Sequence, residues 1–253
     1  MVRSKTNSLT RRVWQRLKEH GPMGIAHAVT YRIREAYYEW SLGIRTADHV
    51  AAHLIGVGPD GEDYFPTDYQ LFERAIRRIT VHPWLDVFLD IGCGKGRLLV
   101  MAAKYPFRRV IGIDFSEELC RAARENVKSL RPAERDRVEV IQADATAFQV
   151  PDEVTVIFMF NPFTGRVLQQ SLERIRESLL RSPRVLWLYY LQPAHHENLL
   201  DMCQWLVCRA VLTTAPRFDM RLYEYVGWAL PSEQLQTRLL PQTTPEIEVQ
   251  KQG

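Results

Sequence analysis

From Val87 onward, short apolar runs alternate with segments in which apolar residues recur every three or four positions. The runs predict strands over 87–91, 109–113, 138–141, 154–160 and 184–191. The periodic segments predict helices over about 96–104, behind Ser116, over about 165–180 and over about 194–206. Such alternation is typical of a parallel sheet covered by helices.

Two further β-rich runs, 207–214 and 222–230, end the predicted fold. Because the stretch between them holds Pro216 and is too short for a crossover helix, this last pair is expected to be antiparallel. The fold class predicted is therefore Rossmann-like α/β, with a seven-stranded, mostly parallel sheet, an antiparallel last strand and helices on both faces.

Ahead of the sheet, the pattern predicts two amphipathic helices over about 9–20 and 22–40, and a further helix over 68–79. We expect three parts: an N-terminal helical extension over 1–60, the α/β domain over 61–233, and a flexible tail over 234–253 that is rich in Gln, Thr and Pro.

The composition of the 253 residues, 46% hydrophobic and 25% charged, excludes a disordered or collagen-like chain. No apolar stretch has the roughly 18–20 residues that a membrane helix needs, and no secretory signal is evident. The four cysteines form no C-x-x-C pair, so we expect reduced thiols and a cytoplasmic protein.

Charge is uneven along the chain. Residues 1–45 hold nine Lys or Arg against three Asp or Glu, a net +6, while the remainder holds 24 against 27, a net −3. The basic segment fits either an anionic partner such as nucleic acid or an ordinary solvated helix face.

The most informative run is the strand-to-helix turn over 88–97, in which Asp90 precedes three alternating glycines, Gly92, Gly94 and Gly96. The dinucleotide pattern G-x-G-x-x-G fails because Arg97 stands where the third glycine is needed, and the phosphate-loop pattern fails because Leu89 stands in place of its first glycine. Lys95 and Arg97 carry charges that can reach anions, but an arginine on this helix is expected to face solvent.

Two more acids follow the next two predicted strands: Asp114 ends the second strand and Asp144 the third. A carboxylate at such a strand end can accept both hydroxyls of a ribose. Each acid alone also fits a turn or cap, but three successive strand ends closing on an acid favour one shared ligand.

The turn and the acids resemble motif I and its neighbours in the class I S-adenosylmethionine (SAM)-dependent methyltransferases. The resemblance implies SAM as cofactor, no metal, Asp114 on the ribose and Asp144 on the adenine amino group. It implies these cofactor-binding residues: Asp90, Gly92, Gly94, Gly96, Asp114, Phe115, Asp144, Ala145, Tyr64 and Thr67. The last two lie in segment 61–69, which resembles a loop ahead of the sheet in a group of bacterial class I methyltransferases.

After the fourth predicted strand, Asn161, Pro162 and Phe163 resemble the [DN]-P-P-[FY] motif of amino-directed methyltransferases, with one proline missing. The resemblance implies that these three residues face the methyl acceptor, although Asn-Pro also fits a turn that ends a strand. The missing proline disfavours nucleic-acid adenine as acceptor. His49 and His53 lie four residues apart without a third ligand, so no metal site is expected.

The function expected is thus methyl transfer from SAM to an unidentified acceptor, most simply a nitrogen of a protein lysine or a small amine. The alternative is a non-catalytic SAM-binding protein that docks to an anionic partner through its basic N-terminal helices. The two differ in whether a methyl group is transferred.

Overall fold

The structure is a computed structural model, and it describes residues 26, 29–50, 64–160, 165–193, 203–213 and 218–226. The chain divides into two compact units, residues 1–43 and residues 44–253. The expected boundary at residue 60 falls in 51–63, outside the described residues.

In the first unit, residues 29–42 are helical, and the helix ends at Gly43, whose φ is 67° and whose N–H donates to the carbonyl of Trp40. This agrees with the later part of the helix predicted over 22–40. The helix predicted over 9–20 lies outside the described residues.

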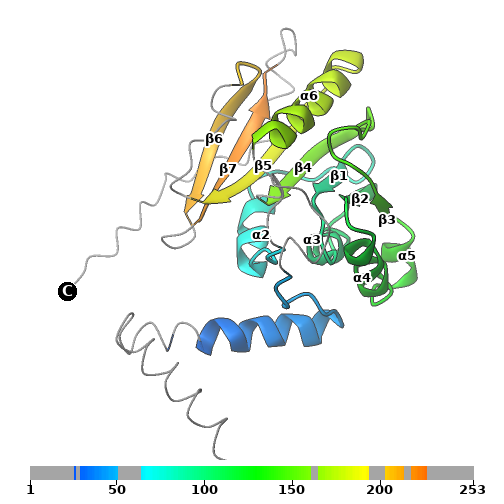
Figure 1. Cartoon of the computed structure of the whole chain (residues 1–253), viewed down its shortest axis with the longest axis vertical. Helices are drawn as coiled ribbons and strands as arrows, with labels where there is room; N and C mark the ends of the chain where they lie inside the picture. Colours follow the sequence, from blue (N-terminus) through cyan, green and yellow to red (C-terminus); the bar gives the residue numbers. More distant parts are fainter. Residues whose placement is uncertain are drawn as a thin grey trace, which may run out of the picture. The chain divides into compact units, whose positions relative to one another are not determined.

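The second unit is built on a seven-stranded sheet with the order β3-β2-β1-β4-β5-β7-β6 (Figure 1). Its strands are β1 Val87–Ile91, β2 Arg109–Asp114, β3 Val138–Gln142, β4 Val154–Phe160, β5 Trp187–Pro193, β6 Leu206–Thr213 and β7 Phe218–Tyr225. Strands β1 to β5 pair in parallel, whereas β7 lies antiparallel to both β5 and β6. The predicted fold class is confirmed.

The helices described in this unit are α2 Tyr69–Ile76, α3 Arg97–Ala102, α4 Glu117–Val127, α5 Pro132–Arg135 and α6 Gly165–Arg181. Ser116 caps α4 as predicted, because its side chain accepts from the backbone N–H of Leu119. Asp68 caps α2 in the same way, through the N–H of Leu71. None of the described helices is long and apolar enough to cross a membrane.

Helices cover both faces of the sheet. The apolar stripe of α6, which includes Leu172 and Ile175, joins one core cluster with Leu89 and Ile157 of the central strands. Strand residues that alternate with these, such as Phe88 on β1, point to the opposite face of the sheet. There the ring of Phe88 lies 6.1 Å from that of Phe72 on α2. Since strand side chains alternate between faces, one continuous apolar strand supplies both cores.

Several predicted boundaries differ from the structure. Strand β5 begins at Trp187 rather than Arg184, and the short helix α5 was not predicted. The described end of the predicted helix 194–206 is a turn that leads into β6, with the N–H of Leu206 donating to the carbonyl of Cys203. Strand β7 begins at Phe218 rather than at residue 222, because polar Asp219 and Arg221 interrupt the apolar pattern at its start.

Candidate functional site

The carboxyl ends of β1, β2 and β3 meet at one edge of the sheet because the three strands are neighbours and parallel. Asp114 is the last residue of β2 and pairs with Gln142, the last residue of β3, so that Asp144 follows only two positions later. Asp90 lies one position before the end of β1. The sheet order thus brings the ends of all three predicted acidic strands to one edge.

The glycine turn has a backbone conformation that residues other than glycine rarely adopt. Gly92, Gly94 and Gly96 have φ values of 80°, 52° and 76°, all in the left-handed region. The turn is tied to β2, since the N–H groups of Gly92 and Cys93 both donate to the carbonyl of Ile113 at 2.9 Å. The three glycines are therefore required by conformation at the predicted loop.

Asp114 organises the turn through its carboxylate. Oδ2 accepts from the N–H of Gly94 at 2.9 Å, and Oδ1 accepts from the N–H of Ser116 at 2.9 Å. Burial raises the pKa of Asp114, while hydrogen bonds from Ser116, Gly94 and Phe115 act in the opposite direction. The carboxylate is thus oriented by the loop that it supports.

Asp90 is a buried acid without a partner in the described part of the chain. It is 3% exposed, and none of the hydrogen bonds or ion pairs there reaches its carboxylate. Burial raises the pKa of Asp90 well above its usual value, and the charge of Asp114 adds to the effect. Two neighbouring acids without a cationic side chain between them favour a positively charged ligand.

Asp144 and Phe115, which are predicted to bind the adenosine part of the cofactor, are more exposed than Asp90. Asp144 is exposed, and its Oδ1 accepts from the backbone N–H of Thr146 at 2.8 Å and from its hydroxyl at 2.7 Å, while neighbouring Ala145 packs on the core. Phe115 is 53% exposed directly after Asp114. An exposed aromatic ring beside a strand-end carboxylate can stack on a flat ligand.

Tyr64 lies directly on the glycine turn. A side chain at Gly94 would bring its Cβ to 2.2 Å from Cε2 of Tyr64, so the ring packs where only glycine leaves room. The ammonium group of Lys95 lies 5.4 Å from the centre of the same ring. Tyr64 also pairs with Val50 through two backbone hydrogen bonds, which brings the segment that begins at Ile44 to the site.

Two residues that the sequence does not mark as site residues, Asn126 and Arg97, hold this segment. Asn126 on α4 accepts from the N–H of Arg45 at 2.9 Å and donates to the carbonyls of Arg45 and Lys95. Arg97 was expected to face solvent, and this is wrong: it is 2% exposed and donates to Thr46. Its partners lie far away in the sequence, where no periodic pattern indicates them.

Thr67, predicted to bind the cofactor, is buried, and its carbonyl accepts from Nη1 of Arg97 at 2.8 Å.

The thiols of Cys93 and Cys120 are close to the acids. Burial, together with Asp114 among other groups, raises the pKa of Cys93 well above the usual value and that of Cys120 to about 11. Both therefore stay neutral near pH 7, so neither is a thiolate nucleophile.

In the part of the chain that the structure describes, no three His, Cys, Asp or Glu side chains gather as a metal site. His49 instead packs against Phe65 in a tilted arrangement with 4.3 Å between the ring centres, and His53 lies outside the described residues.

The predicted acceptor residues Asn161, Pro162 and Phe163 also lie outside the described residues. In the sequence they lie between the end of β4 at Phe160 and the start of α6 at Gly165. Strand β4 pairs with β1, and the order of the sheet reverses between these two strands. Ligands of open α/β sheets bind in the crevice at such a switch point.

Comparisons with known proteins agree with this geometry. Residues 88–181 match the family described as methyltransferase domain. Over 98 residues the chain is 33% identical to a tRNA1(Val) (adenine(37)-N6)-methyltransferase of Bacteroides thetaiotaomicron, covering 36% of this chain and 40% of that protein. It is 26% identical over 98 residues to a protein-lysine N-methyltransferase of Saccharolobus islandicus, covering 38% of this chain and 58% of that one.

The chain thus matches only part of the length of these curated relatives. Among solved structures, a putative methylase from Haemophilus influenzae is similar over 71% of this chain and 100% of its own, with 18% identity and a TM-score of 0.50. That likeness concerns the fold. The chain therefore carries a region similar to methyltransferase domains over residues 88–181, and this region contains the glycine turn and all three strand-end acids.

Proposed function

We propose that this protein transfers a methyl group from SAM to an acceptor nitrogen. The observation that carries the proposal is the pair Asp90 and Asp114, two adjacent carboxylates of raised pKa with no cationic side chain paired to them among the described residues. SAM carries an ammonium and a sulfonium, so it supplies the positive charge that this end of the sheet lacks. A nicotinamide dinucleotide brings a pyrophosphate instead, which two carboxylates repel.

The residues present fit SAM in other respects as well. The left-handed glycines leave the backbone of the turn open to close contact with the methionine end, and the ring of Tyr64 closes one side of it. Asp114 would hold the ribose and Asp144 the adenine amino group. Phe115 and Ala145 would contact the adenine ring. Bound SAM supplies an electrophilic methyl group on sulfur.

The protein's contribution to transfer is alignment and exclusion of water, since an in-line displacement requires the nucleophile and the methyl group to be collinear with sulfur. We assign Asn161 the role of accepting hydrogen bonds from the acceptor nitrogen, so that its lone pair points at the methyl group. We assign Pro162 and Phe163 to the same acceptor site. The attacking nitrogen must be neutral: a nearby carbonyl can orient it by accepting a hydrogen bond, and a carboxylate or water takes the proton that it loses.

The choice of nitrogen is supported by the two curated relatives, one an adenine N6-methyltransferase and the other a protein-lysine N-methyltransferase. A labelling experiment identifies which class of molecule carries the acceptor nitrogen. Incubation of the full chain with methyl-labelled SAM and fractionated lysate should label one of the protein, RNA, DNA and small-molecule fractions.

Saturable SAM binding with no label in any fraction would support the alternative, a non-catalytic SAM-binding protein that docks through its basic N-terminal segment. Removal of residues 1–43 should then abolish partner binding and leave SAM affinity unchanged. Binding of a nucleic acid would in addition weaken steeply with salt.

A further inference from the structure

Arg97 occupies an unusual place for a cation. It is the first residue of α3, directly after Gly96, and its side chain is 2% exposed. Burial disfavours a charged guanidinium, and the positive end of a helix disfavours a cation. A buried arginine here therefore depends on the groups that it contacts.

Those groups come from two segments on either side of residues 51–63. Nε donates to the hydroxyl of Thr46 at 2.7 Å, and Nη1 donates to the carbonyl of Thr67 at 2.8 Å. The guanidinium also lies 4.1 Å from the centre of the Tyr69 ring. One side chain thus joins both ends of the segment that precedes the sheet to the start of the helix behind the glycine turn.

Thr46 extends this connection to the glycine turn. It is fully buried, and while its hydroxyl accepts from Arg97, its carbonyl accepts from the hydroxyl of Tyr64 at 3.0 Å. The ring of Tyr64 in turn packs on Gly94. The contacts therefore run from Arg97 through Thr46 and Tyr64 to the backbone of the turn.

We propose that Arg97 is a positioning residue for the cofactor: by holding Thr46 and Thr67, it fixes the ring of Tyr64 against Gly94 and so shapes the end of the site that receives the methionine moiety. The inference rests on the proposed function, because it concerns the same site. It assigns a role to the segment that begins at Ile44, which lies before the region similar to methyltransferase domains.

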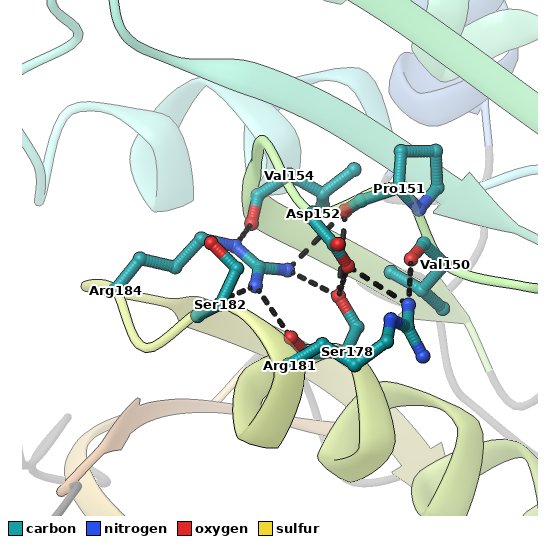
Figure 2. A network of polar contacts seen from close by, with 8 residues as sticks. All are labelled: Val150, Pro151, Asp152, Val154, Ser178, Arg181, Ser182 and Arg184. Atoms are coloured by element: carbon teal, nitrogen blue, oxygen red, sulfur yellow. Dashed lines mark hydrogen bonds and ion pairs between the residues drawn. The ribbon is translucent and has the colours of Figure 1, made fainter.

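A half-buried arginine with comparable hydrogen bonds, Arg184, provides a control. Arg184 donates to the carbonyls of Val154 at 2.6 Å and Ser182 at 2.8 Å, and to the hydroxyl of Ser178 at 2.7 Å (Figure 2). Asp152 and Arg181 belong to the same network. It lies where β4 begins and α6 ends, at the opposite end of the strands from the glycine turn. Arg184 thus makes comparable bonds away from the proposed site.

The test compares Arg97→Lys with Arg184→Lys in the full chain, measuring the Kd of S-adenosylhomocysteine by calorimetry and the Tm by thermal melting. Lysine cannot reproduce the fork of the guanidinium. We expect both variants to lower Tm, and only Arg97→Lys to weaken binding, by about tenfold for lost charged hydrogen bonds. Thr46→Val should weaken binding in the same direction, and Thr46→Ser, which keeps the hydroxyl, should restore it.

Tyr64 decides between positioning and general stability. If Arg97 acts through Tyr64, Arg97→Lys has little further effect on the Kd in a Tyr64→Ala background, although its Tm loss persists. Equal Kd values for wild type, Arg97→Lys and Thr46→Val, or effects of Arg97→Lys and Tyr64→Ala that simply add, overturn the inference alone. A wild-type chain that does not bind the compound at all overturns the proposed function beneath it.

Discussion

The backbone N–H of Gly94 donates a 2.9 Å hydrogen bond to Oδ2 of Asp114. This bond joins the glycine turn after β1 to the acid that closes β2, and it orients the carboxylate that we assign to the ribose. The turn and the neighbouring strand end therefore form one unit, and a change at either residue is expected to affect both.

Replacement of Asp114 by Asn tests this unit. The amide has one acceptor oxygen in place of two, so it cannot satisfy the N–H groups of both Gly94 and Ser116 while also holding a ribose. We expect the affinity for S-adenosylhomocysteine to fall by about ten- to a hundredfold, measured by calorimetry. The remote Asp152→Asn variant should keep the wild-type affinity, and an Asp114→Asn chain that binds equally well contradicts the assignment.

Gly94→Ala should be costly for two separable reasons. A positive φ of 52° disfavours alanine, and the added Cβ would lie 2.2 Å from the ring of Tyr64. We expect a loss of unfolding free energy of about 1–3 kcal/mol, measured by chemical denaturation. Adding Tyr64→Ala should recover the steric part and leave the backbone part. No recovery at all would show that the ring does not press on the turn.

Asp90 should make the stability of the cofactor-free chain depend on pH. Because the folded chain raises the pKa of Asp90, it binds this proton more tightly than the unfolded chain does. The stability contribution is therefore present at low pH and is lost as pH rises from the unfolded value of about 4 through the raised folded value.

Asp90→Asn removes this titration. Relative to wild type, we expect a higher Tm at about pH 8, a difference that shrinks toward pH 4, and weaker SAM binding at every pH. Thermal melts across that range with parallel calorimetry provide the check. A variant less stable than wild type at pH 8 would mean that the buried carboxylate of Asp90 is compensated in the free protein.

Asn161→Ala should separate binding from transfer. If Asn161 orients only the acceptor nitrogen, the variant keeps the wild-type Kd for S-adenosylhomocysteine and loses about a hundredfold or more in methyl transfer. The rate is measured with the lysate fraction that the wild type labels. A parallel loss of cofactor affinity would place Asn161 in the cofactor pocket, and an unchanged rate would remove it from the acceptor site.

Most of the sheet could be predicted from the sequence, because its central strands are buried on both faces and read as continuous apolar runs. The bounds of β1 and β4 agree with the prediction for this reason. Strand β7 was misplaced since polar Asp219 and Arg221 lie within it, and Arg184, predicted to open β5, instead binds carbonyls at the end of α6. Local pattern does not reveal such long-range hydrogen bonds.

The site divides in the same way. The glycines and the strand-end acids were found because each sits at a recognisable change from strand to turn. Arg97 and Asn126 could not be predicted as site residues, because their role depends on contacts with residues 45–46 and with Thr67. The helix pattern around them does not indicate partners so distant in the sequence. The burial of Arg97 depends on these segments coming together in the fold.

The central claim is that the paired carboxylates at the ends of β1 and β2 receive the cationic cofactor. Calorimetric titration of the wild-type chain with SAM and, separately, with NAD measures it most directly. The account predicts saturable one-to-one binding of SAM, no heat of binding for NAD, and loss of the SAM signal in the Asp90→Asn, Asp114→Asn double variant. Binding of NAD instead, or SAM affinity that survives the double variant, would contradict it.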